Sequence, residues 1–263
     1  MLRNTKQLKG FTIRAMDGDI GVVDQLYFDD ETWAVRYLAV YTGTWLSGRQ
    51  VLISPIAIIH TDWQSRSIHV SLTKHQVEQS PDINTKLPVS RQHEAATLGY
   101  YGYARYWVGP YLWGPSSYPD QRAIEPANKT SEFVTRQSEE SHLRSTEGII
   151  GYNIYAEDGE IGHLDGFVMD DEPWSLRYIE VATRNWWPGK KVLVSPAWIE
   201  RISWTSPELY VGLLREVIKS GPEYIESIPI TREYESQLYF HYGRPPYWPN
   251  DVTHSESLSL RDA

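Results

Sequence analysis

Hydrophobic positions in the first hundred residues fall into short runs that polar turns separate. Residues 20–28 and 33–41 are rich in Val, Leu, Tyr and Trp and alternate in part between apolar and polar positions. Residues 50–54 and 67–72 add further short runs of the same kind. Short β-branched and aromatic runs with regularly spaced turn signals predict five or six strands of a small sandwich or barrel.

Turn and cap residues support this division of the chain. Asp17 and Gly18 stand between two apolar runs, and a glycine there supplies the positive φ that a tight hairpin requires. Thr73 and Gln76 form a capping-box pattern that predicts a short helix. Residues 90–100 predict a second helix at the end of the unit.

The whole pattern returns 141 residues later, without a gap, over about 100 residues. Matching pairs include Asp17-Gly18 with Asp158-Gly159, Asp29-Asp30-Glu31 with Asp170-Asp171-Glu172, Trp33 with Trp174, Arg36-Tyr37 with Arg177-Tyr178, Trp45 with Trp186 and Tyr106-Trp107 with Tyr247-Trp248. We therefore predict an all-β chain of two tandem small β-barrels with short peripheral helices, at residues 1–107 and 149–248.

Two stretches lack this pattern. Residues 108–148 and 249–263 are dominated by Pro, Ser, Gly and charged residues and show no apolar periodicity. Such composition predicts a flexible polar linker between the two copies and a disordered tail after the second.

Composition narrows the chemistry. Eleven Trp and eighteen Tyr stand against five Phe, which suits half-buried sheet faces and interfaces. Cysteine is absent, which excludes disulfides, thiolate metal sites and cysteine nucleophiles. No run approaches the roughly 20 apolar residues of a membrane span, and the start of the sequence lacks the apolar core of a signal peptide, so we expect a cytoplasmic protein.

The charge is uneven along the chain. The formal net charge is −9, with 11 Lys and Arg against 10 Asp and Glu in residues 1–107, and 9 against 15 in residues 149–248. Proteins that bind phosphate backbones usually present a basic face, so nucleic acid is an unlikely partner of the second copy. The near-neutral first copy leaves RNA binding open.

The motifs resemble the PRC-barrel family. They comprise the Asp-Gly-Asp/Glu-Ile-Gly hairpin, the Asp-Asp-Glu turn, Trp-x-x-Arg-Tyr, and a Trp-x-x-Gly loop before a strand that ends in Ser-Pro. The resemblance covers residues 8–72 and 149–213. It implies small β-barrels that act by docking, as in the cytoplasmic domain of the photosynthetic reaction-centre H subunit. We expect neither the membrane-spanning helix of that subunit nor the N-terminal domain of the related ribosome maturation factor, since no segment of the sequence resembles them.

No pattern predicts catalysis, a cofactor or a metal. The His residues do not recur at the repeat offset, and the sequence has no HExxH motif and no Gly-rich phosphate loop. The acidic turns at residues 29–31 and 170–172 could hold Ca²⁺, but they lack the spacing of a calcium loop, so solvated turns are the preferred interpretation.

Two pairs and two glycines are predicted to be structural. Asp24 with Arg36, and Asp165 with Arg177, are expected to form an ion pair between neighbouring strands in each copy. Gly18 and Gly159 are expected to shape the hairpins.

Two loops combine tryptophan with cations. Trp45 and Arg49 belong to the first, and Trp186, Trp187, Lys190 and Lys191 belong to the second. Each loop could present its tryptophan to a partner protein or to lipid headgroups, or could fold back over the barrel mouth. The aromatic segments at residues 100–113 and 239–248 could stack on RNA, but wrapping a barrel or sealing a contact between the copies is preferred.

We therefore predict a non-catalytic protein-interaction scaffold with an unidentified protein partner, in which the two barrels could pack as an intramolecular pseudo-dimer or form homo-oligomers. One alternative is a peripheral component of a photosynthetic or electron-transfer membrane complex. Another is an RNA- or ribosome-associated factor.

Overall fold

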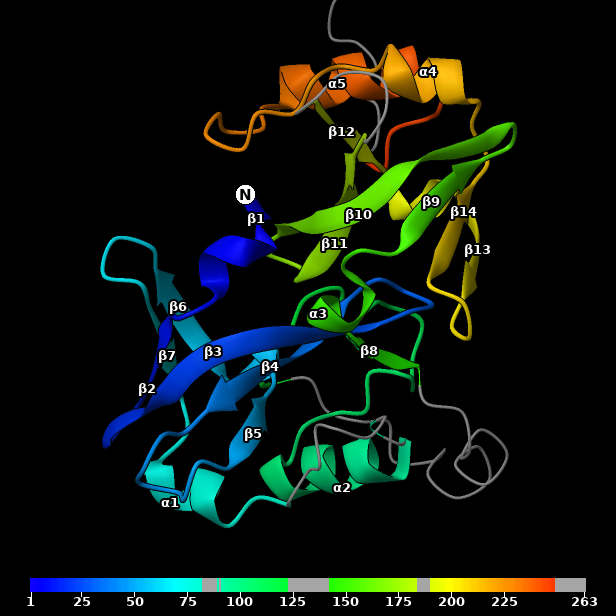
Figure 1. Ribbon diagram of the computed structural model, residues 1–263. Coiled ribbons are helices and arrows are strands. Elements are labelled where there is room, and N and C mark those ends of the chain that lie inside the picture. Colours follow the sequence, from blue (N-terminus) through cyan, green and yellow to red (C-terminus); the bar gives the residue numbers. More distant parts are fainter. Residues whose placement is uncertain (82–88, 90, 123–141, 184–189, 249–263) are drawn as a thin grey trace, which may run out of the picture.

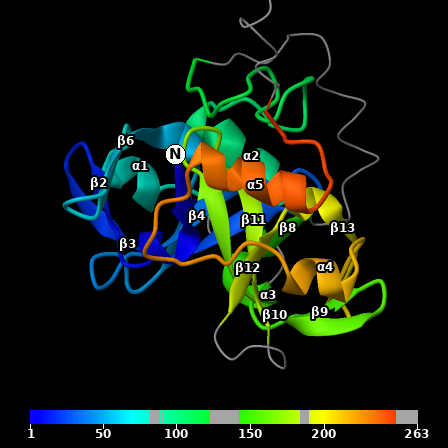
Figure 2. The same cartoon turned by 90° about the horizontal axis from the view of Figure 1, so that it is seen from above.

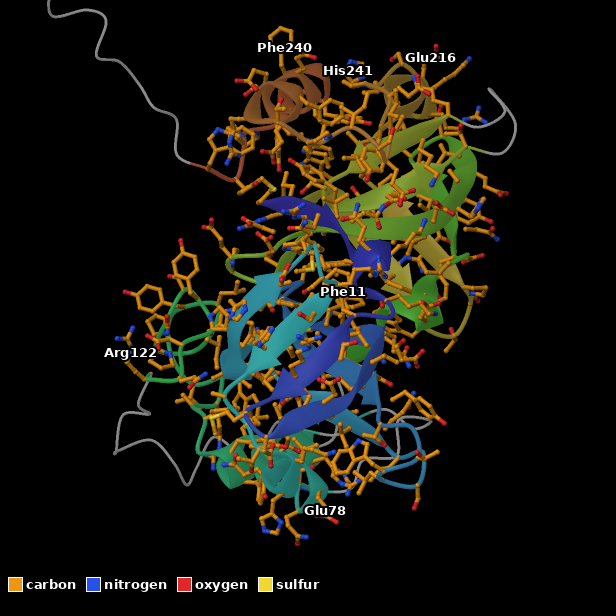
Figure 3. The ribbon with its side chains drawn as sticks, turned by 90° about the vertical axis from the view of Figure 1, so that its left-hand side faces the viewer. Phe11, Glu78, Arg122, Glu216, Phe240 and His241 are labelled. Atoms are coloured by element: carbon orange, nitrogen blue, oxygen red, sulfur yellow. The ribbon has the colours of Figure 1, made fainter. Side chains whose placement is uncertain are left out.

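Two β-sheets fill the middle of the molecule, and short helices cover its two ends (Figure 1). The computed structural model describes residues 1–81, 89, 91–122, 142–183 and 190–248. Helices α1 (Lys74–Glu78) and α2 (Arg91–Tyr101) lie at one end, and α4 (Arg215–Lys219) and α5 (Arg232–His241) lie at the other. Figure 3 shows Phe240 of α5 and Glu78 of α1 at these opposite ends, with Phe11 between them.

Each copy builds one sheet with the same strand order. The order in the first sheet is β5-β4-β3-β2-β7-β6, and in the second it is β12-β11-β10-β9-β14-β13. The strands of the first sheet are β2 (Thr12–Ala15), β3 (Gly18–Asp29), β4 (Val35–Tyr41), β5 (Gln50–Ile53), β6 (Ile58–Asp62) and β7 (Ser67–Val70). Those of the second are β9 (Asn153–Ala156), β10 (Gly159–Asp170), β11 (Ser175–Ala182), β12 (Lys191–Val194), β13 (Ile199–Ser203) and β14 (Glu208–Val211).

The predictions of a mostly β chain and of two similar units are therefore confirmed. The predicted runs at residues 20–28, 33–41, 50–54 and 67–72 correspond to β3, β4, β5 and β7. Among the described residues, each sheet runs between two end strands, so the pairings do not close a barrel. Helix α5 lies over β11 and β12 of the second sheet (Figure 2).

Each sheet is completed by a strand from the other copy. Strand β1 (Leu2–Asn4) lies at the start of the first copy but pairs antiparallel with β10, and β8 (Leu143–Ser145) lies just before the second copy but pairs antiparallel with β3. The register is equivalent, since Leu2 lies opposite Asp170 and Leu143 lies opposite Asp29. Because β2 pairs only with the first part of β3, the borrowed strand covers an edge that would otherwise stay unpaired.

The two copies also meet directly around a pseudo-two-fold axis. Ala34 and Ser175, which correspond to each other in the repeat, form an antiparallel bridge. Trp33 and Trp174 precede them, and both have a positive φ, of 58° and 53°. One cluster of buried apolar side chains contains residues of both copies, so the halves share a core.

The predicted flexible linker differs from the structure at both of its ends. Within residues 108–122, Leu112 and Gln121 contact the first copy, and Trp113 is only 3% exposed. Residues 142–148 contain β8 and the start of α3 (Thr146–Ile149). The prediction failed there because isolated anchors such as Trp113 leave no periodic signal in a Pro- and Gly-rich stretch. The rest of the predicted linker and the predicted tail lie outside the described residues.

Candidate functional site

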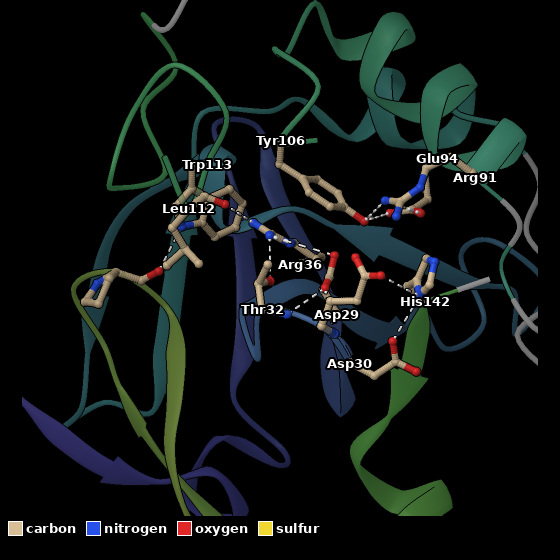
Figure 4. Close-up of polar contacts among 12 residues, drawn as sticks. Asp29, Asp30, Thr32, Arg36, Arg91, Glu94, Tyr106, Leu112, Trp113 and His142 are labelled. Atoms are coloured by element: carbon tan, nitrogen blue, oxygen red, sulfur yellow. Dashed lines mark hydrogen bonds and ion pairs between the residues drawn. The ribbon is translucent and has the colours of Figure 1, made fainter. Parts of the chain in front are cut away.

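The guanidinium of Arg36 is the centre of a buried polar cluster in the first copy (Figure 4). It donates to the carbonyl of Leu112 at 2.8 Å and to Thr32 Oγ1 at 3.0 Å. Asp29 Oδ2 lies 3.9 Å away, and the Tyr106 ring centroid lies 3.7 Å from the guanidinium carbon. Burial lowers the pKa of Arg36, while the neighbouring Tyr106 and Asp29 oppose that shift. These contacts compensate the cost of burying a charge.

The predicted pairing of Arg36 with Asp24 is wrong. Asp24 Oδ2 instead accepts a hydrogen bond from Gln50 Nε2 at 2.9 Å. The register between β3 and β4 shifts at Asp24, between Val23 and Gln25, so side chains no longer alternate regularly between the faces. Asp29, at the far end of β3, is the carboxylate that lies near Arg36.

In the second copy, Asp165 joins a charge cluster and does not pair with Arg177 as predicted. Lys6 Nζ, from the other copy, and Lys191 Nζ each lie 2.7 Å from Asp165 Oδ2. The buried Glu180 carboxylate lies 3.4 Å from Lys6 Nζ and 3.6 Å from Lys191 Nζ. Although partial burial opposes the shift, hydrogen bonds from the two lysines lower the pKa of Asp165 to about 2. Lys191 is therefore engaged within the fold.

The acidic turns bind the exchanged strands. Asp30 lies 2.7 Å from Arg144 Nε and 3.2 Å from His142 Nδ1, both from the segment that carries β8. At the equivalent place in the other half, Arg3 Nε of β1 lies 3.5 Å from Asp171 Oδ2. The solvated-turn interpretation is therefore wrong for these aspartates, since each turn holds a strand of the opposite copy.

An open cleft of about 1170 Å³, here called the interface cleft, lies between the two copies on the side of the second. Arg177 of β11 lines the cleft, with its guanidinium carbon 4.1 Å from the Tyr247 ring centroid and Nη2 3.8 Å from Asp170 Oδ2. Arg144, from the exchanged strand, stacks on Trp204 at 4.0 Å. The wall also contains Trp33, Trp198, Tyr239 and Pro245. Aromatic rings beside cations are typical of surfaces that bind protein partners.

Each copy buries a glutamate that joins its last helix to its sheet or to the segment that follows. Glu94 of α2 accepts a short hydrogen bond from Tyr106 and lies 3.4 Å from Arg91. Burial raises the pKa of Glu94 to about 7. Glu235 of α5, its repeat equivalent, accepts the matching hydrogen bond from Tyr247 at 2.9 Å and a further one from Tyr178 at 2.7 Å. A contact made by both copies indicates that these carboxyls serve the fold.

The first predicted binding loop is folded back onto its own copy. Trp45 Nε1 donates to the carbonyl of Ile20, and Lys74 Nζ lies 4.5 Å from the ring centroid. Arg49 donates to the carbonyls of Glu78 at 3.2 Å and Ser80 at 2.8 Å, at the end of α1. Trp45 and Arg49 therefore stabilise the loop and the helix end, where a cation is favourable.

Lys190 repeats the role of Arg49. Its Nζ donates to the carbonyls of Lys219 at 2.7 Å and Gly221 at 2.9 Å, at the end of α4. Trp186 and Trp187 lie outside the described residues. Of the cations predicted to bind a partner, Arg49 and Lys190 instead act on the last carbonyls of a short helix in each copy.

The two predicted structural glycines have the expected backbone conformation. Gly18 has a φ of +137° and Gly159 has a φ of +134°, and each follows a two-residue hairpin turn. The preceding Asp17 accepts a hydrogen bond from the backbone N–H of Lys74, which holds α1 against the hairpin.

Sequence reasoning missed the exchanged strands and the docked segment. The exchange left one detectable signal, since Leu-Arg-x-Thr occurs at residues 2–5 and again at residues 143–146, at the repeat offset. Leu112 and Trp113 left no such signal, because Thr253 and His254 stand at the corresponding positions after the second copy.

Within the part of the chain that the structure describes, no group of three or more His, Asp or Glu residues is arranged to hold a metal ion. None of the helices among these residues has the length and apolarity needed to cross a bilayer. No family model matches the sequence, and no curated protein matches it. The arrangement of the two copies and the interface cleft therefore carries the functional argument.

Proposed function

We propose that this protein is a non-catalytic protein-interaction module made of two PRC-like units, and that the interface cleft is its binding surface. The observation that carries the proposal is the cleft itself, which both copies line with aromatic rings and with Arg144 and Arg177. Stacked arginines and aromatic side chains are the residue types that contribute most to binding at protein interfaces.

Polar groups outside the cleft support a scaffold function. Arg49 and Lys190 bind helix ends, and Glu94 and Glu235 accept hydrogen bonds from the matching tyrosines Tyr106 and Tyr247. These contacts with helix ends and buried carboxyls are accounted for by folding. The cleft breaks this symmetry, because Trp198 and Tyr239 in its wall correspond to Ala57 and Leu98 in the first copy.

The test uses the intact chain as bait in a lysate of its native source, followed by titration of the purified partner. Arg177→Glu and Trp204→Ala alter the cleft, and Phe240→Ser is the matched control, since Phe240 is 89% exposed on the outer end of α5. We expect one polypeptide to bind the wild type and the control, and we expect both cleft variants to lose this binding. Equal binding by all four proteins would refute the cleft as the binding surface.

A further inference from the structure

The interface cleft has an equivalent in the first copy, and there the equivalent groove is occupied. Subtracting the repeat offset from the cleft residues Arg177, Tyr247, Trp204 and Arg144 gives Arg36, Tyr106, Trp63 and Arg3. The stacking contacts are equivalent as well. The guanidinium of Arg36 lies over Tyr106 as that of Arg177 lies over Tyr247, and Arg3 stacks on Trp63 at 4.4 Å as Arg144 stacks on Trp204 at 4.0 Å.

The occupant of the first groove is a tight turn of the chain itself. Tyr111 and Gly114 exchange two backbone hydrogen bonds of 3.0 Å, which places Leu112 and Trp113 at the tip of the turn. Gly114 has a φ of +74°, and a Cβ there would lie 2.7 Å from the carbonyl oxygen of Arg105. The turn therefore requires glycine at this position.

Three contacts hold the turn in its groove (Figure 4). Arg36 Nη1 donates to the Leu112 carbonyl at 2.8 Å, and the guanidinium lies 4.9 Å from the Trp113 ring centroid. Trp113 Nε1 donates to the carbonyl of Pro173, from the opposite copy, at 2.8 Å. The groove thus recognises a backbone carbonyl, an aromatic face and an indole N–H.

The interface cleft offers equivalent groups. Arg177 is 25% exposed, and its guanidinium has one face on Tyr247. Thr32, which stands where Pro173 stands in the other half, also lines the cleft. After the second copy, Thr253 and His254 stand at the positions that correspond to Leu112 and Trp113. The sequence there does not repeat the turn that occupies the first groove.

We infer that the interface cleft binds a turn-forming segment of a partner protein whose tip carries an aliphatic residue followed by tryptophan. Arg177 donates to the backbone carbonyl of the aliphatic residue and stacks on the indole, and the Thr32 carbonyl accepts the indole N–H. This inference rests on the proposed function and specifies the chemistry of the ligand.

The test measures binding of a fluorescein-labelled peptide of residues 108–118, cyclised to hold the turn, to the full chain by fluorescence polarisation. We expect saturable binding that Arg177→Met weakens about tenfold, which corresponds to about 1.4 kcal/mol for the lost charge-assisted hydrogen bond. Arg14→Met is the matched control, because Arg14 lies on β2, is not among the cleft residues and pairs with Asp19 at 3.6 Å. A cyclic peptide with Ala at the positions of Leu112 and Trp113 is expected not to bind.

The outcomes separate this inference from the proposed function. Equal binding to the wild type and Arg177→Met, or no binding of the cyclic peptide, overturns the inference, whereas a partner protein that still depends on the cleft would leave the proposed function intact. Binding that occurs only after truncation at Trp248 would identify the chain's own tail as the occupant and would also overturn the inference. Self-association of the full chain that the cyclic peptide reverses would identify a second copy of the chain as the occupant, and it would likewise overturn the inference.

Discussion

Replacement of Trp113 by alanine tests whether residues 108–122 belong to the folded body. The indole is 3% exposed and donates to the Pro173 carbonyl. Burial of an aromatic side chain removes about 150–250 Å² from water, which corresponds to about 4–6 kcal/mol at about 25 cal/mol per Å². Alanine retains part of that burial, and large-to-small changes of this kind cost about 3–5 kcal/mol.

We therefore expect Trp113→Ala to lower the free energy of unfolding by about 3–5 kcal/mol. The assay is urea denaturation followed by far-ultraviolet circular dichroism, which does not depend on the tryptophan that is removed. Tyr111→Ala is the control in the same turn, because Tyr111 is 57% exposed and contributes its backbone to the turn, so we expect a change of at most about 0.5 kcal/mol. Equal stabilities of the two variants would refute the docking of this segment.

Three further predictions concern the polar clusters and the strand exchange. The folded-state pKa of Glu94 is about 7, above its ordinary 4.5, so the stability that this group contributes is complete below pH 4.5 and is lost as the pH rises through 7. Urea denaturation should show that the free energy of unfolding falls by on the order of 3 kcal/mol over this range, and that Glu94→Gln removes this pH dependence. An unchanged pH dependence in the variant would contradict this assignment. A double-mutant cycle of Asp30→Asn and Arg144→Met should give a coupling of about 1–2 kcal/mol in unfolding experiments, whereas a value near zero would mean that the contact does not hold the exchanged strand. Fragments 1–122 and 142–263 should copurify as a one-to-one complex and fail to fold alone, and a stable folded monomer of either by size-exclusion chromatography would show that the exchange is dispensable.

The sequence predicted the features that repeat and that obey local rules. The strands, the duplication and the capping box at Thr73 and Gln76 all carry a period, an offset or a fixed spacing, and the structure has them. The position of Gly18 was predictable for the same reason, since positive φ restricts the residue type.

The parts that sequence reasoning missed depend on contacts between distant segments. Strand β8 is too short to show alternation, and its partner β3 lies more than 100 residues away. Asp29 and Arg36 both lie near the turn that joins β3 to β4, where the register shifts between Tyr27 and Phe28, and the residue types there do not predict that shift. The docking of Trp113 depends on a carbonyl from the opposite copy, which only the assembled halves provide.

The reciprocal exchange of β1 and β8 bears on the origin of the molecule. A single-copy ancestor with this topology would have completed its sheet only with a second molecule, so it would have been a homodimer with two identical grooves. Joining two such copies in one chain would remove that identity, since each groove could then acquire its own mutations. One groove could take in a neighbouring stretch of the chain while the other remained free for an outside ligand, a division that no symmetric dimer can make.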